Sequence, residues 1–458
     1  MKIIKPGKPS VRKILGNQRR KSGICRKMRY VLEARGEGGL RLLNTITGDL
    51  AELDPAEAAA WQALPQELSE TLAELYRLHF LVPVAFDERK TVEQIRAVLR
   101  LTTRTKSFHS FVILPTTVCN ARCFYCYESG YPHHTMTEKT AEDTVQFILK
   151  NCGSLRKTKI HWFGGEPLVG KDRIAQICRR LGEEAFEFSS KMTSNGYLFT
   201  PELVREAKED WHLTFVQITL DGTEAIYNRT KAYAGADGSP YYRVLGNIES
   251  LLDAGIRVSV RMNLDRHNEQ DLAHLIDELA KRFAGKAGLA CYTHELFDQQ
   301  GFEPIRHTGS EWDEIARRRH ELDHRIEEAG LSLAGESRGL PSLRMNFCMA
   351  DSPESALINP LGELGKCEHV PYDPPFGDVR GGVRDPAILD KWLNSEFEDS
   401  CAACELYPYC ARMTTCPTKD PCREDTRREE LSRFRKNMLA ARADETKEEP
   451  DGPELTDC

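Results

Sequence analysis

The sequence predicts an α/β protein, because apolar, strand-like runs alternate with helical segments through the middle of the 458-residue chain. Six such runs lie between residues 111 and 293, with the sequences FVILPTT, KIHWFGG, KMTSN, FVQITL, IRVSVRMN and LACYT. Strands joined by crossover helices run parallel in one sheet. Because a closed TIM barrel needs eight such units, six units predict a partial (β/α)6 barrel of TIM type over residues 108–300.

Three segments precede the predicted barrel. The start of the chain lacks acidic side chains, so we expect a solvated basic arm over residues 1–28. Short strands followed by helices, with Asp54 and Pro55 as a helix start, predict a small winged-helix-like domain over residues 29–88. A charged helical pattern then predicts a linker helix over residues 89–107.

Three further segments follow the predicted barrel. They are a bridging helical segment over residues 301–347, a cysteine-rich and loop-heavy region over residues 348–438, and an acidic tail over residues 439–458. We expect the N-terminal domain and the cysteine-rich region to have separate hydrophobic cores. Removal of residues 1–88 would then spare the cysteine-rich region.

Composition narrows the class of protein. The opening MKIIKPGK is not of signal-peptide type and no run of 18 apolar residues occurs, which predicts a cytoplasmic protein without a membrane segment. A net charge of −7 with 29% charged residues argues against general nucleic-acid binding. In a reducing compartment, 15 cysteines indicate metal ligation or catalysis rather than structural disulfides.

The segment CNARCFYC places Cys119, Cys123 and Cys126 close together in the sequence. Structural zinc sites usually take four ligands in two pairs, whereas this segment has three thiols and no histidine. Soft thiolates also select iron-sulfur clusters, and a cube of four irons normally takes four cysteines. Three cysteines therefore leave one iron open for a substrate or a cofactor.

Glycine and polar residues follow the other predicted strands at their carboxyl ends, where TIM-type barrels carry their function. They are Gly164, Gly165, Glu166 and Pro167 after the second strand, Ser194 and Asn195 after the third, Thr219 and Asp221 after the fourth, and Asn263 at the end of the fifth. Single residues of this kind are weak signals. Their order on successive strand ends predicts one shared site with the cysteine loop.

The three-cysteine spacing, followed about forty residues later by GGEP, resembles the radical S-adenosylmethionine (SAM) superfamily over about residues 111–268. The resemblance implies a 4Fe-4S cluster on Cys119, Cys123 and Cys126, whose open iron chelates the amino and carboxylate groups of SAM. One electron then cleaves a carbon-sulfur bond of SAM and releases a 5'-deoxyadenosyl radical. It also implies an electron donor such as a flavodoxin or a ferredoxin.

The same resemblance assigns roles in SAM binding. Tyr125 would lie beside the adenine, because a flat ring suits a base. Gly164 and Gly165 would let the backbone approach the methionine end of SAM, where Glu166 or the adjacent carbonyls accept from its amino group. Thr219 and Asp221 would hold the ribose hydroxyls, Arg229 the carboxylate and Asn263 the nucleoside, and Pro167, Ser194 and Asn195 complete the predicted SAM site.

The cysteine-rich region resembles the SPASM domain, which in its full form holds two auxiliary 4Fe-4S clusters. The implied ligands are Cys348, Cys367 and Cys416 for the first cluster, and Cys401, Cys404, Cys410 and Cys422 for the second. Because no cysteine stands shortly before Cys348, the first cluster lacks an obvious fourth ligand. Cys291, an oxygen ligand or an open iron are the alternatives for that position, and a zinc-ribbon module is the alternative for the region.

By its element order and position, the N-terminal domain resembles the peptide-recognition element of enzymes that modify ribosomally made peptides. In that element a leader peptide adds as a strand to a sheet edge. The combination predicts a maturase that binds a ribosomal precursor peptide and forms a thioether or a carbon-carbon crosslink. Two alternatives are a formylglycine-forming enzyme of the anaerobic sulfatase-maturase type and a non-catalytic, metal-stabilised binding module.

Overall fold

The chain forms two compact units, each assembled from separate stretches of the sequence. The first unit contains Met1–Arg104, Ser337–Ser352 and Ser395–Cys458, and the second contains Thr105–Glu336 and Pro353–Asn394. The computed structural model describes residues 1–16, 23–36, 38–103, 107–152, 158–265, 268–296, 299–300, 303–304, 309–334, 340–346, 348–394, 401, 403–410, 416 and 424–441. Within these residues, no helix is both long and apolar enough to cross a membrane.

The second unit is built on six parallel strands that neighbour one another in chain order, as the alternation of apolar runs predicted. The strands are β8 (Ser110–Thr116), β9 (Thr158–Gly164), β10 (Phe188–Ser194), β11 (Leu213–Thr219), β12 (Arg257–Leu264) and β13 (Leu289–Glu295). Every neighbouring pair among them is parallel, so their carboxyl ends lie at one edge of the sheet. The predicted α/β class with a central parallel sheet is confirmed.

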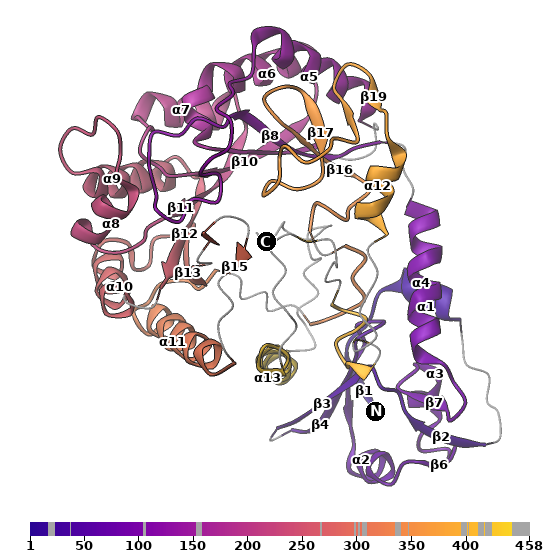
Figure 1. Cartoon of the computed structure of the whole chain (residues 1–458). Coiled ribbons are helices and arrows are strands. Elements are labelled where there is room, and N and C mark those ends of the chain that lie inside the picture. Colours follow the sequence, from indigo (N-terminus) through magenta and orange to yellow (C-terminus); the bar gives the residue numbers. More distant parts are fainter. Residues whose placement is uncertain are drawn as a thin grey trace. The chain divides into compact units, whose positions relative to one another are not determined.

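Helices connect these strands and lie on the outer side of the curved sheet (Figure 1). They are α5 (Glu138–Asn151), α6 (Lys171–Glu183), α7 (Pro201–Glu209), α8 (Glu224–Lys231), α9 (Pro240–Asp253) and α10 (Glu269–Phe283), and α11 (Gly309–Glu328) follows the last strand. Local sequence fixes their starts. For example, the Thr200 side chain accepts from the Leu203 amide at the start of α7, where Pro201 occupies the first turn. Apolar side chains of helices and strands form one large core, which includes Phe111, Trp162 and Ile218.

The sheet of the second unit continues beyond the six strands. β16 (Ser355–Ile358) pairs in parallel with β8, and β17 (Glu363–Gly365), β18 (Gly377–Asp378) and β19 (Gly382–Val383) follow as antiparallel neighbours. Residues 353–394, which the sequence analysis grouped with the cysteine-rich region, thus belong to the same compact unit as the barrel strands. The reason is main-chain pairing with β8, which the sequence of β16 does not reveal.

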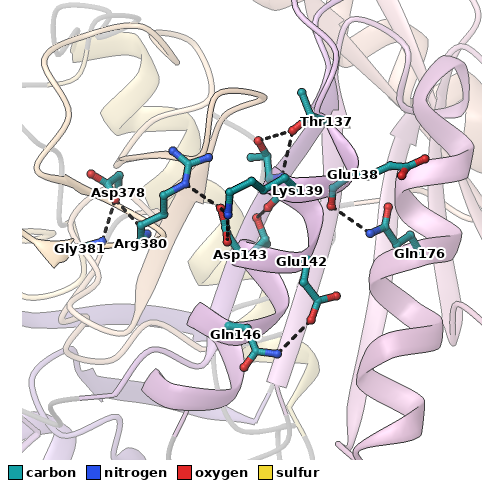
Figure 2. Close-up of polar contacts among 12 residues, drawn as sticks. Thr137, Glu138, Lys139, Glu142, Asp143, Gln146, Gln176, Asp378, Arg380 and Gly381 are labelled. Atoms are coloured by element: carbon teal, nitrogen blue, oxygen red, sulfur yellow. Dashed lines mark hydrogen bonds and ion pairs between the residues drawn. The ribbon is translucent and has the colours of Figure 1, made fainter.

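Side-chain contacts also hold this extension against α5 (Figure 2). The Arg380 guanidinium pairs with the Asp143 carboxylate at 2.7 Å. Asp378 accepts from the backbone amides of Arg380 and Gly381 at 2.9 and 2.8 Å, which fixes the tight connection between β18 and β19. The polypeptide between Cys367 and α12 (Pro386–Leu393) is therefore anchored to the barrel.

The first unit contains two small antiparallel sheets. One has the order β1 (Lys2–Lys5), β5 (Leu50–Leu53), β4 (Gly39–Asn44), β3 (Val31–Gly36), and the other has the order β6 (Gln66–Glu67), β2 (Ile24–Lys27), β7 (Leu81–Pro83). Its helices are α1 (Pro9–Leu15), α2 (Pro55–Gln62), α3 (Ala73–Arg77), α4 (Glu88–Thr103) and α13 (Glu424–Ala440). α2 begins where Asp54 and Pro55 predicted, with a complete capping box between Asp54 and Glu57.

The segment that was predicted as a solvated basic arm contains structure. β1 pairs with β5, and α1 follows it directly. Ile4 and Val11 are buried in the cores of the first unit, because these two apolar side chains fall on inward-facing positions among the lysines and arginines. Absence of acidic residues was therefore a poor guide to solvation in this segment.

The N-terminal region and the cysteine-rich segment share hydrophobic cores, so the expectation of separate cores is wrong. In one core Leu32 and Leu43 pack with Leu406 and Phe434. In the other core, Tyr30 stacks on Tyr407 with ring centroids 6.0 Å apart, and α4 contributes Val92 and Ile95. Removal of residues 1–88 would expose apolar side chains around Cys404 and Cys410, and would not spare this region.

Arg96 of α4 connects the predicted linker helix to the loop that carries these cysteines. Its buried guanidinium donates to the main-chain oxygens of Tyr407, Pro408 and Cys410 at 2.9, 3.2 and 3.3 Å. It also lies 4.9 Å from the centre of the Tyr407 ring. α4 therefore supports the loop that carries Cys404 and Cys410, in addition to its place as a linker helix along the chain.

We expect Arg96→Met to destabilise the first unit by about 3 kcal/mol, because it leaves buried carbonyl groups without a donor. If Cys404 and Cys410 hold iron as the sequence predicts, the iron content should fall with it. Lys90→Met, at an exposed position of the same helix, is the matched control. Thermal unfolding under anaerobic conditions and iron content measure the two effects. Equal melting temperatures for the two variants would show that Arg96 has no supporting role.

Candidate active site

The cysteine loop follows β8 at the carboxyl edge of the parallel strands. Its three thiols are half-buried and none of them forms a disulfide. The loop folds back on itself, since the Cys126 amide donates to the Cys123 carbonyl at 3.2 Å and the Ala121 amide donates to the Cys119 sulfur at 3.4 Å. One short loop therefore presents three sulfur donors.

The donor set fits an iron-sulfur cluster. Burial raises the pKa of Cys119 to about 12, with Glu166 as a second cause, and burial raises the pKa of Cys126 to about 11, with Glu128 as a second cause. Bound iron would lower the pKa of these thiols instead, because coordinated thiols are deprotonated. Among the described residues, no three His, Cys, Asp or Glu side chains converge on the position of a single ion. Three sulfurs spread along a loop suit several irons that each take one thiolate.

Gly164 and Gly165 bring β9 against the stem of the cysteine loop. A Cβ atom at Gly164 would lie 2.3 Å from the Thr116 carbonyl oxygen, and one at Gly165 would lie 2.6 Å from the Val118 carbonyl oxygen. Gly164 also has a φ of +114°, which other residues rarely adopt. The Gly165 amide donates to the Thr116 carbonyl at 3.2 Å. The two glycines therefore allow a close backbone approach that positions the loop, and their contact with SAM stays a prediction.

Glu166 is fully buried and holds the end of β10 in place. Its carboxylate accepts from the Leu168 amide at 3.1 Å, from the Ser194 hydroxyl at 2.9 Å and from the Asn195 amide at 2.8 Å. Burial raises the pKa of Glu166 to about 7, although these hydrogen bonds act in the opposite direction. Pro167 begins the short 3-10 helix that follows, η1 (Pro167–Gly170). Glu166 thus acts as a positioning residue for Ser194 and Asn195.

Asn195 connects the end of β10 to the cysteine loop. Its side-chain amide donates to the Asn120 side-chain oxygen at 2.7 Å and lies 3.9 Å from the Cys119 sulfur. Asn120 was not predicted as a site residue, although its place between the first two cysteines is a signal for it. The contact ties the end of β10 directly to the first part of the cysteine loop.

A buried polar network joins the cysteine loop to β11, α8 and β12. The Tyr125 hydroxyl donates to Asp221 at 2.7 Å, and Lys231 pairs with the same carboxylate at 2.9 Å. The Lys231 ammonium also donates to the Tyr125 hydroxyl at 2.9 Å, and the Asn263 amide donates to Asp221 at 2.8 Å. Residues that lie far apart in the sequence therefore meet at Asp221.

Lys231 is the buried cation of this network. Its side chain is 4% exposed and that of Asp221 is 3% exposed. Burial lowers the pKa of Lys231, but the Asp221 carboxylate outweighs it and the pKa is raised well above its ordinary value. Lys231 is therefore charged at neutral pH, and its positive charge is balanced by the Asp221 carboxylate.

The structure places the predicted carboxylate partner Arg229 elsewhere. Arg229 is exposed on α8, whereas Tyr227, Thr230 and Lys231 form the buried face of that helix. Lys231 was not among the residues predicted from the sequence. Its spacing of four residues from Tyr227 places both side chains on one helical face, but the spacing does not tell that this face is the buried one. Thr219 is the last residue of β11 and is half-buried, two residues before Asp221 in the sequence.

The predicted auxiliary ligands divide between the two units. Cys367 is buried in the second unit, after β17. The other described ones, Cys348, Cys401, Cys404, Cys410 and Cys416, are half-buried in the first unit, and Cys422 lies outside the described residues. The amide of Cys404 donates to the Cys401 carbonyl at 3.0 Å, so these two residues lie in one turn. Their assignment to clusters stays a prediction.

Cys291, an alternative fourth ligand, lies in β13 within the large core of the second unit. Burial raises its pKa to about 12. Its amide donates to the Ser332 carbonyl at 2.8 Å, which ties β13 to the chain that follows α11. Apolar surroundings of this kind are typical of an inert core thiol.

Comparison with known proteins agrees with this geometry. The family model "Radical SAM superfamily" matches residues 113–279. A GTP 3',8-cyclase from Clostridium perfringens (strain SM101 / Type A) is 27% identical over 298 residues, which are 62% of this chain and 88% of the relative. Another, from Lactiplantibacillus plantarum, is 29% identical over 160 residues, and the match spans 34% of this chain and only 44% of that relative.

Solved structures share the fold at low identity. The structure of anSMEcpe with bound AdoMet, another name for SAM, has a TM-score of 0.55 at 13% identity, over 72% of this chain and 98% of that one. Streptococcus suis SuiB bound to SAM has a TM-score of 0.50 at 15% identity, over 84% of this chain and 94% of that one. Together with the cysteine loop at the carboxyl edge of six parallel strands, the family match leads to one assignment. Residues 113–279 of this chain are a domain of the radical SAM superfamily.

Proposed function

We propose that this protein is a radical SAM enzyme that modifies a ribosomally made precursor peptide. The observation that carries the radical SAM part is the contact between the cysteine loop and the charged pair Asp221–Lys231, made through Tyr125. Three thiols for a cluster and a buried charged pair for a zwitterionic ligand then lie within one connected site.

In this proposal Cys119, Cys123 and Cys126 hold a 4Fe-4S cluster whose fourth iron is open to SAM. When bound, cluster and SAM supply a 5'-deoxyadenosyl radical that abstracts hydrogen from the substrate. Lys231 attracts the SAM carboxylate, because it is a buried cation whose ammonium contacts Tyr125 of the cysteine loop. Asp221 accepts from the ribose hydroxyls and is held in place by Asn263.

The peptide part of the proposal rests on the first unit. A leader peptide needs an unpaired sheet edge, and the four-stranded sheet of that unit has β1 and β3 as its outer strands. Among the described residues, the same unit carries five of the predicted ligands of auxiliary clusters, and three of them, Cys401, Cys404 and Cys410, pack against cores shared with the N-terminal region. Support also comes from the structure of anSMEcpe with AdoMet and the Cp18Cys peptide, whose TM-score is 0.53 at 14% identity.

The cofactors and partners follow from this reading. Cys401, Cys404, Cys410 and Cys422 would hold one auxiliary 4Fe-4S cluster, and Cys348, Cys367 and Cys416 would contribute to another. A flavodoxin or a ferredoxin would deliver the electron. The product would be a thioether or a carbon-carbon crosslink within the core of the peptide.

Two other activities compete. GTP cyclisation is favoured by the match to 88% of the Clostridium perfringens relative, although that alignment covers only 62% of this chain. Formylglycine formation is favoured by the similar fold of anSMEcpe. Neither gives a role to the winged-helix-like region.

The experiment presents reduced holoenzyme and SAM with three substrates in parallel. They are GTP, a sulfatase-type peptide with a central cysteine, and the precursor peptide encoded next to the gene. We expect 5'-deoxyadenosine to form in step with a precursor that has lost two hydrogens, as measured by mass spectrometry. Turnover of GTP or formylglycine formation, with the precursor unchanged, would refute the proposal.

A further inference from the structure

The six parallel strands of the second unit have two different faces. Successive side chains of a strand point to opposite faces, and one face packs against the helices. In β10, Met192 is buried in the large core, whereas its neighbour Lys191 is half-buried. In β13, Cys291 is buried in the same core, whereas Tyr292 and His294 are half-buried. The face turned away from the helices, here called the inner face, therefore keeps side-chain surface that a ligand can contact.

Arg261 of β12 brings a positive charge to the inner face. Its neighbours Val260 and Met262 pack in the large core, so its half-buried side chain points the other way. The six strands contain one acidic residue, Glu295, and its carboxylate pairs with Arg319 at 3.3 Å. Within these strands, no further acidic side chain is present to balance Arg261.

The contacts of the Arg261 guanidinium leave several of its five N–H groups for a ligand. Its Nε donates to the Asn263 side-chain oxygen at 3.0 Å. Its Nη2 lies 3.0 Å from the His294 Nδ1, but that nitrogen also lies 2.7 Å from the Glu295 carbonyl oxygen. Because a carbonyl oxygen only accepts, Nδ1 carries the proton there and has no lone pair for Arg261. Among the residues that the structure describes, no carboxylate forms an ion pair with this guanidinium.

Arg261 is linked to the proposed SAM site. Asn263, two residues further along β12 and on the same inner face, donates to Asp221 at 2.8 Å. The Tyr125 hydroxyl of the cysteine loop donates to the same carboxylate at 2.7 Å. Since β12 ends at Leu264, on the carboxyl edge, Arg261 lies further inside the sheet than Asn263. A group bound by Arg261 would therefore lie beside the proposed SAM site, on its inner side.

We propose that Arg261 binds the carboxylate of an acidic side chain in the core of the substrate peptide. A guanidinium fork matches the two oxygens of a carboxylate, and the pair is strengthened where water is partly excluded. A flexible acidic side chain lets the peptide main chain stay at the carboxyl edge, where the radical is proposed to form. The inference rests on the proposed peptide substrate, and it names one residue type that the core must contain. Phosphates of GTP are oxyanions too, so GTP is the competing ligand in the test.

The first test changes the peptide alone. In the precursor encoded next to the gene, each Asp or Glu of the core is replaced in turn by Asn or Gln, which keeps the shape and removes the charge. One of these replacements should raise the Kd of the core peptide for the wild-type enzyme about 10- to 100-fold, the loss expected for a charged hydrogen-bonded pair. The other replacements should have little effect. Because this test needs no enzyme variant, its result does not depend on how well a variant folds.

The second test changes the enzyme. Arg261→Gln removes the charge and keeps a donor for Asn263. It should raise the Kd of the unchanged core peptide by a similar factor, and cause no further loss with the peptide whose acid is replaced. Arg261→Lys, which keeps the charge but not the fork, should lose less affinity. Arg257→Gln is the matched control, since it removes the same charge from the exposed start of the same strand. Its Kd values should stay near those of the wild-type enzyme.

Iron-loaded, full-length enzyme is used throughout, and calorimetry measures the Kd of SAM and, with SAM present, the Kd of the core peptide without its leader. Equal affinity for every peptide of the series, a modified core without any acidic residue, or additive losses in Arg261→Gln would each overturn the inference alone. So would a Kd of SAM that rises as much as that of the peptide, because Arg261 would then only position Asn263. Turnover of GTP with the precursor unchanged would overturn the proposed function, and this inference with it.

Discussion

Replacing Cys119, Cys123 and Cys126 together with alanine is expected to abolish SAM cleavage. The three thiols are the sulfur donors of the loop after β8, and no disulfide or other cysteine of that loop replaces them. Without them the cluster that these residues are proposed to hold has no ligands, so no electron reaches SAM. Formation of 5'-deoxyadenosine under reducing conditions measures the effect, with iron and sulfide content recorded in parallel.

Cys152→Ala is the matched control for this variant. Cys152 is half-buried at the end of α5 and accepts from the Thr158 hydroxyl at 3.4 Å, away from the strand ends. Its replacement should leave iron content and SAM cleavage at the wild-type level. Continued 5'-deoxyadenosine formation in the triple variant would contradict the assignment of the SAM cluster to this loop.

Lys231→Met is expected to have the second largest effect, on stability and on SAM binding together. It removes one partner of a buried ion pair and leaves Asp221 without its cation, which costs about 3–5 kcal/mol in comparable buried pairs. The change also removes the charge that we propose attracts the SAM carboxylate. We therefore expect a lower melting temperature and a large rise in the Kd of SAM, both measurable by calorimetry on iron-loaded enzyme.

Arg229→Met separates this prediction from the one made from sequence. Arg229 is exposed on the same helix, so its replacement should change stability by about 0.5 kcal/mol at most. SAM affinity should also stay near the wild-type value. If Arg229→Met weakens SAM binding and Lys231→Met does not, the carboxylate is held by Arg229 as the sequence pattern indicated.

The parallel strands could be predicted because their signal is local. Each strand is a short apolar run bounded by polar or glycine residues, and the helices between them carry apolar residues at helical spacing. The cysteine loop could be predicted for the same reason, since its three thiols lie within one segment. The helix start at Asp54 is a further local signal, and its capping box forms between residues three positions apart.

The choice between Arg229 and Lys231 could not be made in this way. Both are cations near the end of α8. Which face of this helix is buried depends on how the helix packs in the folded protein. The same applies to β16, whose place beside β8 depends on main-chain pairing between segments more than two hundred residues apart in the sequence. Main-chain pairing leaves little trace in residue type.

By itself, the sequence determined the α/β class, the order of the six strands and the cysteine loop, because periodicity and ligand spacing act over a few residues. Only the tertiary structure decided which charge is buried beside Asp221, that the N-terminal region shares its cores with the cysteine-rich segment, and that Arg261 lies beside His294. Each of these contacts joins residues that are distant along the chain. Their formation depends on how whole elements pack, and desolvation then fixes which polar groups must find a partner.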